Sequence, residues 1–326
     1  MKKVLGMGNA LVDVLVSIHD DQLLDQFGLP KGSMQLVDKE KSQSIINALS
    51  HMNFEIASGG SAANTINGLA NLGISCGYIG KIHDDKYGKI FTQDMTSKGI
   101  EADLMFGGQD TGIATTLISE DSQRTFATYL GAAVELSPED LKEEYFKGYD
   151  FFHIEGYLVQ NHELIRKAVK LAKQCGLKVC IDLASYNVVE ANLDFLNELI
   201  EEFVDIVFAN EEESKSFTGA EPEEALQKIS AMCEIAVVKI GAKGSLVKRG
   251  KEEVFVESIK ANPIDTTGAG DLYASGFLHG LSHDLSLEKC ARLGSLLGGN
   301  VIEVIGPKMD EDRWAKIKSA VSEILA

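Results

Sequence analysis

The 326-residue sequence lacks several features that would assign it to a specialised class of protein. Its five cysteines are scattered and none has CxxC spacing, so neither a disulfide framework nor a zinc site is indicated. No uninterrupted apolar stretch of about 18 residues occurs, and the first residues lack the apolar run of a secretion signal. We therefore expect a cytoplasmic protein with reduced thiols and no membrane partner.

Positive charge is also scarce, because 31 Lys and Arg face 49 Asp and Glu, giving a net charge of −18. A surface of this sign does not attract polyanions, so we expect no nucleic-acid partner. A small anionic ligand would need local backbone dipoles, a few basic side chains and a metal ion to overcome this field. The remaining composition, 44% hydrophobic and 25% charged, is ordinary for a folded globular protein.

From residue 149 onward, runs typical of strands alternate with runs typical of helices. The predicted strands cover 150–154, 178–182, 205–209 and 235–240. Such alternation predicts a parallel sheet covered by helices, and therefore an α/β fold. Ligands of these sheets bind beyond the carboxyl ends of the strands.

The segment between residues 100 and 131 breaks this alternation. β-rich runs at 113–118 and 124–130, joined by a polar turn at 119–122, predict an antiparallel hairpin. We expect the hairpin to belong to a small sheet inserted into the larger α/β body. The predicted lid comprises 13–38 and 100–131, and the predicted large domain comprises 1–12, 39–99 and 132–326.

The glycine-rich segment Asp265-Thr-Thr-Gly-Ala-Gly-Asp271 precedes an apolar helical pattern. The backbone N–H groups of Gly268-Ala269-Gly270 would point outward at the helix N-terminus and form an anion hole. Asp271 would lie in the first helical turn, where its carboxylate can take a proton from an attacking hydroxyl. The alternative is that Asp271 caps the helix and the glycines form an ordinary turn.

This segment resembles the signature of the ribokinase-like, or PfkB, carbohydrate kinases, in which the last Asp is the catalytic base. The resemblance covers nearly the whole chain with its motifs in order. It implies a three-layer α/β sandwich with a mainly parallel central sheet and a small β-sheet lid. It also implies phosphoryl transfer from ATP in the presence of Mg²⁺.

Two further motifs resemble the substrate-binding part of this family. Ser58-Gly-Gly-Ser-Ala-Ala-Asn64 has the family's glycine pair, Gly59 and Gly60, followed by an Asn that contacts the substrate. Gly8-Asn9 and Asp13 match the early motif whose Asp binds sugar hydroxyls. A plain strand-to-helix turn and a surface aspartate are the alternatives.

On the nucleotide side, Asn210-Glu-Glu-Glu213 resembles the NxxE motif, which implies Mg²⁺ held through water by Asn210 and Glu213. A run of Glu at a helix N-terminus is also favoured by the helix dipole alone. The segment 239–244 resembles the nucleotide loop, and Asn300 lies where relatives line the adenine pocket. The resemblance thus implies nucleotide contacts by Lys239, Gly241, Lys243, Gly244 and Asn300.

In relatives, the counterparts of Asp265 and Thr267 belong to a loop that binds a monovalent cation. This chain has Gly306-Pro307 where family members often carry a Gly-Ala pair, so K⁺ binding stays open. Arg124 resembles an arginine that reaches substrate or phosphate, and an exposed lid arginine is the alternative.

The segments around Gln35 and Tyr157 look most like the adenosine-kinase branch, which implies contacts with a nucleobase and stacking on it. The expected substrate is adenosine or a related nucleoside, phosphorylated on a primary ribosyl hydroxyl. The alternative is a free sugar, as in ribokinase, fructokinase or 2-keto-3-deoxygluconate kinase. The chain would act as a monomer or as a homodimer joined through the lid.

Two other classes are remote. A nucleotide-binding oxidoreductase would need GxGxxG, but position 11 is Leu11. A noncatalytic homologue would have lost the base or the glycines, and both are retained.

Overall fold

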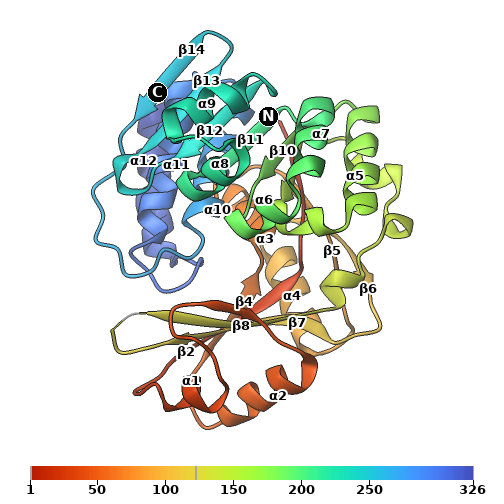
Figure 1. Cartoon of the computed structure of the whole chain (residues 1–326), viewed down its shortest axis with the longest axis vertical. Helices are drawn as coiled ribbons and strands as arrows, with labels where there is room; N and C mark the ends of the chain where they lie inside the picture. The colour runs from red at the N-terminus through yellow and green to blue at the C-terminus, as the bar shows by residue number, and fades with distance from the viewer. Residues whose placement is uncertain (1, 122, 326) are drawn as a thin grey trace.

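The computed structural model describes residues 2–121 and 123–325, so Ser122 of the predicted hairpin turn lies outside the described residues. The chain folds into a large α/β domain and a smaller β sheet beside it (Figure 1). Among the described residues, no helix has both the length and the apolar character that a membrane crossing requires.

The large domain is built on a nine-stranded sheet. Its strands, in spatial order, are β14 (Glu252–Val256), β13 (Ser245–Arg249), β12 (Ile235–Lys239), β11 (Ile206–Asn210), β10 (Lys178–Asp182), β9 (Phe151–Glu155), β1 (Val4–Met7), β5 (Cys76–Ile82) and β6 (Glu101–Phe106). All neighbours are parallel except the β12–β13 and β13–β14 pairs, which are antiparallel. The predicted mainly parallel sheet is confirmed.

Helices cover both faces of this sheet, because side chains along each strand point alternately to opposite sides. Phe152 and Ile154 of β9 belong to the hydrophobic core on one face of the sheet. Phe151 of β9 and Phe208 of β11 belong to the core on the opposite face. The first core is covered by α5 (His162–Gln174), α6 (Tyr186–Ala191), α7 (Leu193–Phe203), α8 (Glu211–Thr218) and α9 (Pro222–Ser230). The second is covered by α3 (Ser61–Asn71), α4 (Lys86–Ser97), α10 (Ala269–Ser282) and α11 (Leu287–Val301), and α12 (Glu311–Leu325) packs on α11. The three-layer prediction is confirmed.

The lid is a five-stranded sheet in the order β3 (Met34–Leu36), β8 (Arg124–Gly131), β7 (Thr111–Ile118), β2 (Leu11–Ser17) and β4 (Glu55–Gly59). The helices α1 (Gln22–Gln26) and α2 (Lys39–Ala48) cover one face of it through an apolar core. The other face looks toward the large domain (Figure 1). β7 and β8 form the antiparallel hairpin that the sequence predicts.

The predicted lid boundaries differ from the observed lid at three elements. β6, placed in the lid, is the edge strand of the large sheet, and β4, placed in the large domain, pairs with β2 of the lid. α2 also covers the lid. Sheet membership depends on pairing with strands distant in sequence, and a local pattern of residues does not carry that information.

Candidate active site

The glycine-rich loop places Asp271 in the first turn of α10. Gly268 begins the helix with a φ of 77°, where a Cβ would lie 2.7 Å from the side chain of Pro307. The helix has no side-chain N-cap. Of the three predicted anion-hole amides, that of Ala269 donates within the loop to the Thr266 carbonyl. The Gly270 amide lies in the first turn, where helical N–H groups have no partner inside the helix.

Two side chains from α3 hold the Asp271 carboxylate. Ser61 Oγ donates to Oδ1 at 2.7 Å, and Asn64 Nδ2 donates to Oδ2 at 3.0 Å. Burial raises the pKa of Asp271 to about 6, although the hydrogen bonds from Asn64 and Ser61 lower it. A carboxylate with this pKa is ionised at neutral pH and is a better proton acceptor than an ordinary aspartate.

This pKa predicts the pH dependence of the reaction. If Asp271 is the base, kcat/KM for the acceptor should fall as pH drops through about 6, because the protonated carboxyl cannot take a proton. Ser61→Ala removes a bond that favours the charged form, so the acid limb should move to higher pH. Ser50→Ala, at an exposed position, is the control and should leave the limb in place. If the acid limb of the kcat/KM profile of Ser61→Ala keeps its pH or moves to lower pH, the Ser61 hydroxyl does not stabilise the charged form of Asp271.

The turn after β1 is fixed by Glu155, the last residue of β9. Glu155 is buried, and its Oε1 accepts from Asn9 N at 2.8 Å and Asn9 Nδ2 at 2.6 Å. Its Oε2 accepts from Ala62 N at 3.0 Å, at the start of α3. Burial raises the pKa of Glu155 to about 7. The side-chain amide of Asn9, which was predicted to bind substrate, thus donates to Glu155. Through Glu155, the turn at Asn9 is joined to the start of α3, directly after Gly59 and Gly60.

Asp13 projects from β2 over the glycine pair. A Cβ on Gly59 would lie 2.3 Å from the Asp13 carboxyl group, and a Cβ on Gly60 would lie 2.2 Å from the Asn9 carbonyl oxygen, so both positions require glycine. Burial raises the pKa of Asp13 to about 7; Lys308 opposes this, and Asp271 adds to it. Asp13 therefore lies within electrostatic range of Asp271.

Lys308 ties this region to the C-terminal segment. Its ammonium donates to Ser58 Oγ at 2.9 Å and to Asp94 Oδ2 at 3.2 Å. The bonds connect β4 of the lid with α4 of the large domain.

Arg124 bridges the lid and the glycine-rich loop. Its guanidinium contacts Asp265 Oδ1 at 2.9 Å, and both side chains are at least nine-tenths buried. Asp265 also accepts from Thr267 N at 2.8 Å and Gly306 N at 2.6 Å. The two oxygens and the charge of Asp265 are thus already satisfied, and this arrangement does not fit a monovalent cation at Asp265 and Thr267.

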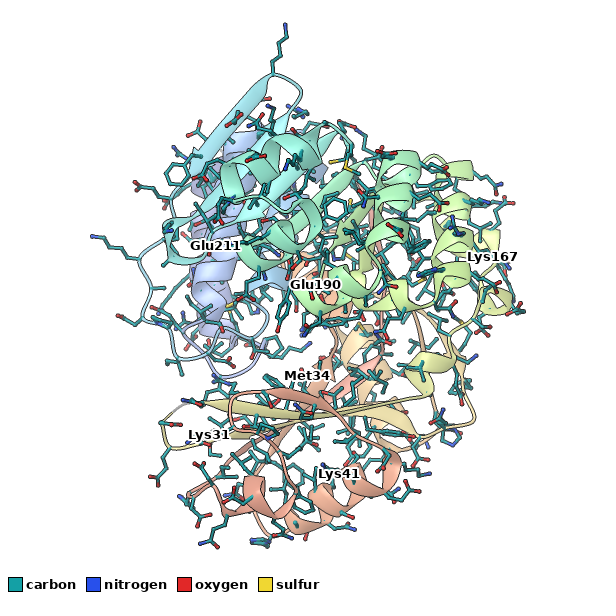
Figure 2. All side chains as sticks on the ribbon, viewed as in Figure 1. Lys31, Met34, Lys41, Lys167, Glu190 and Glu211 are labelled. Carbon is teal, nitrogen blue, oxygen red and sulfur yellow. The ribbon has the colours of Figure 1, made fainter. Side chains whose placement is uncertain are left out.

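Gln35 lies on the opposite face of the lid sheet from Asp13, so the structure does not bring these two predicted substrate residues together. Gln35 pairs with Ala127, whose side chain lies in the apolar core under α1 and α2. Because side chains alternate along a strand, its neighbours Met34 and Leu36 occupy the pocket face instead. Figure 2 shows Met34 on the side of the lid that faces the large domain, whereas Lys41 of α2 lies on the far side.

Tyr157 follows β9 in the 3₁₀ turn Gly156–Gln160 and is partly buried. Its hydroxyl donates to the Ala184 carbonyl at 3.4 Å. Burial raises the pKa of Tyr157, and the carboxyl groups of Glu155 and Asp271 add to the shift, so the Tyr157 ring lies near these two groups.

Asn210 and Glu213 form a capping box at the start of α8. Glu213 accepts from Asn210 N at 2.8 Å and Asn210 Nδ2 at 2.6 Å, and its own amide donates to Asn210 Oδ1 at 2.9 Å. Among the described residues, no group of three or more His, Cys, Asp or Glu side chains could hold a metal by itself. Mg²⁺ commonly binds through one or two carboxylates, water and substrate phosphates. Each of these oxygens accepts one hydrogen bond and keeps a lone pair, so Asn210 and Glu213 could accept from waters bound to the ion.

The remaining predicted nucleotide residues lie at the end of β12, directly after it, or in the last turn of α11. Gly241 and Gly244 have φ values of 55° and 123°, and Lys243 between them is mostly exposed, 3.9 Å from Glu211. The Asn300 side chain donates to the Leu296 carbonyl at 2.8 Å within α11. Lys239 differs from these, because its ammonium is largely buried and bonds to Asp182 Oδ2 at 2.7 Å.

Four residues of this region were not predicted from the sequence: Ser61, Glu155, Asp182 and Lys308. A usable signal existed for two of them, because Glu155 and Asp182 end parallel strands at the sheet edge where ligands bind. Ser61 lies inside the motif Ser58–Asn64, but its partner and that of Lys308 are more than 200 residues away, so a local pattern does not reveal these contacts.

An ATP-dependent sugar or nucleoside kinase is the class of protein that this fold and this arrangement define. The model of the pfkB family of carbohydrate kinases matches residues 34–313, and the chain belongs to that family.

Proteins similar to this chain include both nucleoside and sugar kinases by name. The adenosine kinase from Sinorhizobium meliloti is 36% identical with a TM-score of 0.87, covering 98% of this chain and 99% of that one. A probable sugar kinase from Rhizobium etli is also 36% identical with a TM-score of 0.87, covering 98% of both chains. The 5-dehydro-2-deoxygluconokinase of Bacillus subtilis is 30% identical over 267 residues, which are 77% of this chain and 82% of that relative.

Proposed function

We propose that the protein transfers the γ-phosphoryl group of ATP to the primary ribosyl hydroxyl of a nucleoside, with adenosine as the first candidate. The observation that carries this proposal is the composition of the pocket face of the lid. That face has a carboxylate at one end and exposed apolar side chains at the other.

One row of side chains crosses this face from β2 to β3. Asp13 pairs with Ala114, Ala114 with Thr128, and Thr128 with Leu36. Three strand spacings make this row about 14 Å long. Asp13 suits sugar hydroxyls, the two small residues leave room, and Leu36 is 59% exposed.

The adjacent row has no carboxylate and is mostly apolar. Leu15, Thr116, Phe126 and Met34 follow one another across the same four strands. Met34 is 49% exposed. Exposed large apolar side chains that face a substrate site commonly mark a binding surface. A flat base would cover them, whereas a free sugar would occupy only the Asp13 end.

The chain's own residues then have separate tasks. Asp13 and the backbone at Gly59-Gly60 bind the ribosyl group, and the Asp271 carboxylate takes the proton of its hydroxyl as that oxygen attacks the γ-phosphorus. The first-turn amides of α10 stabilise negative charge on the phosphoryl group. Asn210 and Glu213 would hold Mg²⁺ through water, where the ion neutralises phosphate charge. Because Asp265 is paired with Arg124, the proposal includes no monovalent cation.

Closure of the lid completes the site. Between Asp13, Leu15, Thr116, Asp265 and Pro307 the structure leaves a cavity of about 20 Å³. That volume holds about one water molecule and is too small for a nucleoside, so we infer that the lid and the loop at 265–267 separate when the acceptor enters. The lid would then exclude water from the phosphoryl group.

A sugar kinase is the second candidate, since the Bacillus subtilis relative acts on a free sugar acid derivative by its name. An ATP-consumption screen with adenosine, inosine, ribose, fructose, 2-keto-3-deoxygluconate and 5-dehydro-2-deoxygluconate separates the two. We expect kcat/KM to be highest for a nucleoside. A free sugar that exceeds both nucleosides would overturn the assignment.

A lid variant tests the same proposal through one side chain. Leu36→Ser should lower kcat/KM for the nucleoside about tenfold, because roughly 1–2 kcal/mol of apolar contact with the base is lost. The matched control is Phe255→Ser on β14, which removes a similarly exposed apolar side chain, 53% exposed, from an edge strand of the large sheet. Equal effects of the two substitutions on kcat/KM would argue against a base on the lid.

A further inference from the structure

Lys239 is the last residue of β12, and its ammonium lies against the first turn of α10. A Cβ built on Gly270 would lie 3.0 Å from Lys239 Nζ and 4.0 Å from Asp182 Oδ2. The lysine side chain is 14% exposed and the Asp182 side chain 8% exposed. The ammonium is therefore a largely buried charge next to the predicted anion hole.

The charge of Lys239 is maintained by its surroundings. The ammonium forms an ion pair with the Asp182 carboxylate at 2.7 Å, which favours its charged form. A protonated lysine lies here beside a helix N-terminus, where the helix dipole disfavours a cation. An ion pair that served stability alone would gain nothing from this position. An anion bound between the ammonium and the helix would reverse that unfavourable interaction.

The backbone that holds Asp182 is strained. Asp182 Oδ1 accepts from Ala184 N at 3.1 Å, and Ala184 has a φ of 66°, a left-handed conformation that costs a non-glycine residue free energy. Such outliers persist where the surrounding structure enforces them, and they cluster at functional sites. The strained turn directs Asp182 toward Lys239.

We propose that the Lys239 ammonium contacts the phosphoryl group during its transfer, with Asp182 as the residue that positions it. The acceptor oxygen forms a bond to the γ-phosphorus, and the bond from that phosphorus to the bridging oxygen breaks with its electron pair going to ADP. The hydroxyl proton passes to Asp271. Lys239 transfers no proton and neutralises charge on the phosphoryl oxygens, as a lysine does at a phosphate site. The inference rests on the phosphoryl transfer of the proposed function but not on the choice of acceptor.

Lys239→Met tests this inference. We expect kcat to fall on the order of 100-fold or more, with KM for ATP within about threefold, because the contact is made chiefly in the transition state. The affinity for ADP with aluminium fluoride, a mimic of the transferring phosphoryl group, should fall by a similar factor. The matched control is Lys81→Met, since Lys81 is 12% exposed and contacts Asp140 at 2.8 Å, yet lies elsewhere in the sheet. This control should keep its kcat.

A double variant separates catalysis from folding. Lys239→Met leaves Asp182 without its counter-charge, so the variant can lose stability for that reason alone. Lys239→Met with Asp182→Asn removes both charges and should restore the melting temperature but not kcat. A folded variant lacking Lys239 that turns over within about fivefold of the parent protein would overturn the proposal, as would unchanged affinity for the aluminium fluoride complex. That complex needs no acceptor, so its outcome stands even if the nucleoside assignment fails.

Discussion

Replacing Asp271 with asparagine should lower kcat about 10³-fold, within the range that general-base residues contribute. Asparagine has nearly the same shape and keeps a carbonyl oxygen for Ser61 or Asn64, so the start of α10 should stay folded. ATP binding should change by no more than a few-fold, because the proposed role of Asp271 concerns the acceptor hydroxyl. Steady-state turnover with the best acceptor and calorimetric titration with ATP measure the two effects separately.

The competing explanation is that Asp271 only stabilises a helix N-terminus, and Asp194 provides a matched control. Asp194 is an exposed acidic residue in the first turn of α7. Asp194→Asn should cost at most about 1 kcal/mol of stability through the helix dipole and leave kcat unchanged. If Asp271→Asn behaves like Asp194→Asn, with turnover within tenfold of the parent protein, Asp271 is not the base.

Most strands and helices of the large domain could be predicted from the sequence, because buried parallel strands are short apolar runs between amphipathic helices. The predicted strand 178–182 coincides with β10, and the predicted strand 205–209 is offset by one residue from β11. The division between lid and large domain was less accessible. Only their distant pairing partners place β4 in the lid sheet and β6 in the large sheet.

Gln35 shows how a single position changes a functional prediction in a strand. The segment Met34–Leu36 does reach the lid, as the resemblance implied, but side-chain direction alternates with a period of two. The register with β8 sends Gln35 toward the apolar core and Met34 and Leu36 toward the pocket. No pattern in three residues could have settled that register.

The cluster of charged residues follows from a rule that the sequence could have supplied. β9, β10, β11 and β12 are consecutive neighbours in the large sheet, and they end in Glu155, Asp182, Asn210 and Lys239. Parallel strands bring their carboxyl ends to one edge, so four polar residues that end apolar strands meet there. What the rule does not supply is the partner of each side chain. The Asn210 side chain donates to Glu213, three residues later in the chain, whereas the Lys239 side chain extends past β11 and donates to Asp182 on β10.

Glu155 is the member of that cluster on which the folded site depends most. Glu155→Leu should lower the free energy of unfolding by about 4 kcal/mol, because it leaves the amides of Asn9 and Ala62 buried without acceptors. Glu155→Gln should cost less, about 1–3 kcal/mol, since its oxygen can still accept from Asn9 but its NH₂ group faces the Ala62 N–H. Both variants should also lose turnover, because α3 carries Ser61 and Asn64. Urea unfolding at pH 6 measures the stability, and Glu190→Gln, at an exposed site, should change neither quantity.

The pH dependence of these variants has a definite sign. Burial raises the pKa of Glu155 from 4.5 to about 7 in the folded protein, so the folded state holds a proton that the unfolded state has released. The stability due to this protonated group is fully present below the unfolded value and is lost as pH rises through about 7. Glutamine does not titrate, so the stability difference between the parent protein and Glu155→Gln should shrink from pH 5 to pH 8. A difference that grows over this range would mean that the three N–H donors outweigh burial and that Glu155 is held as a carboxylate.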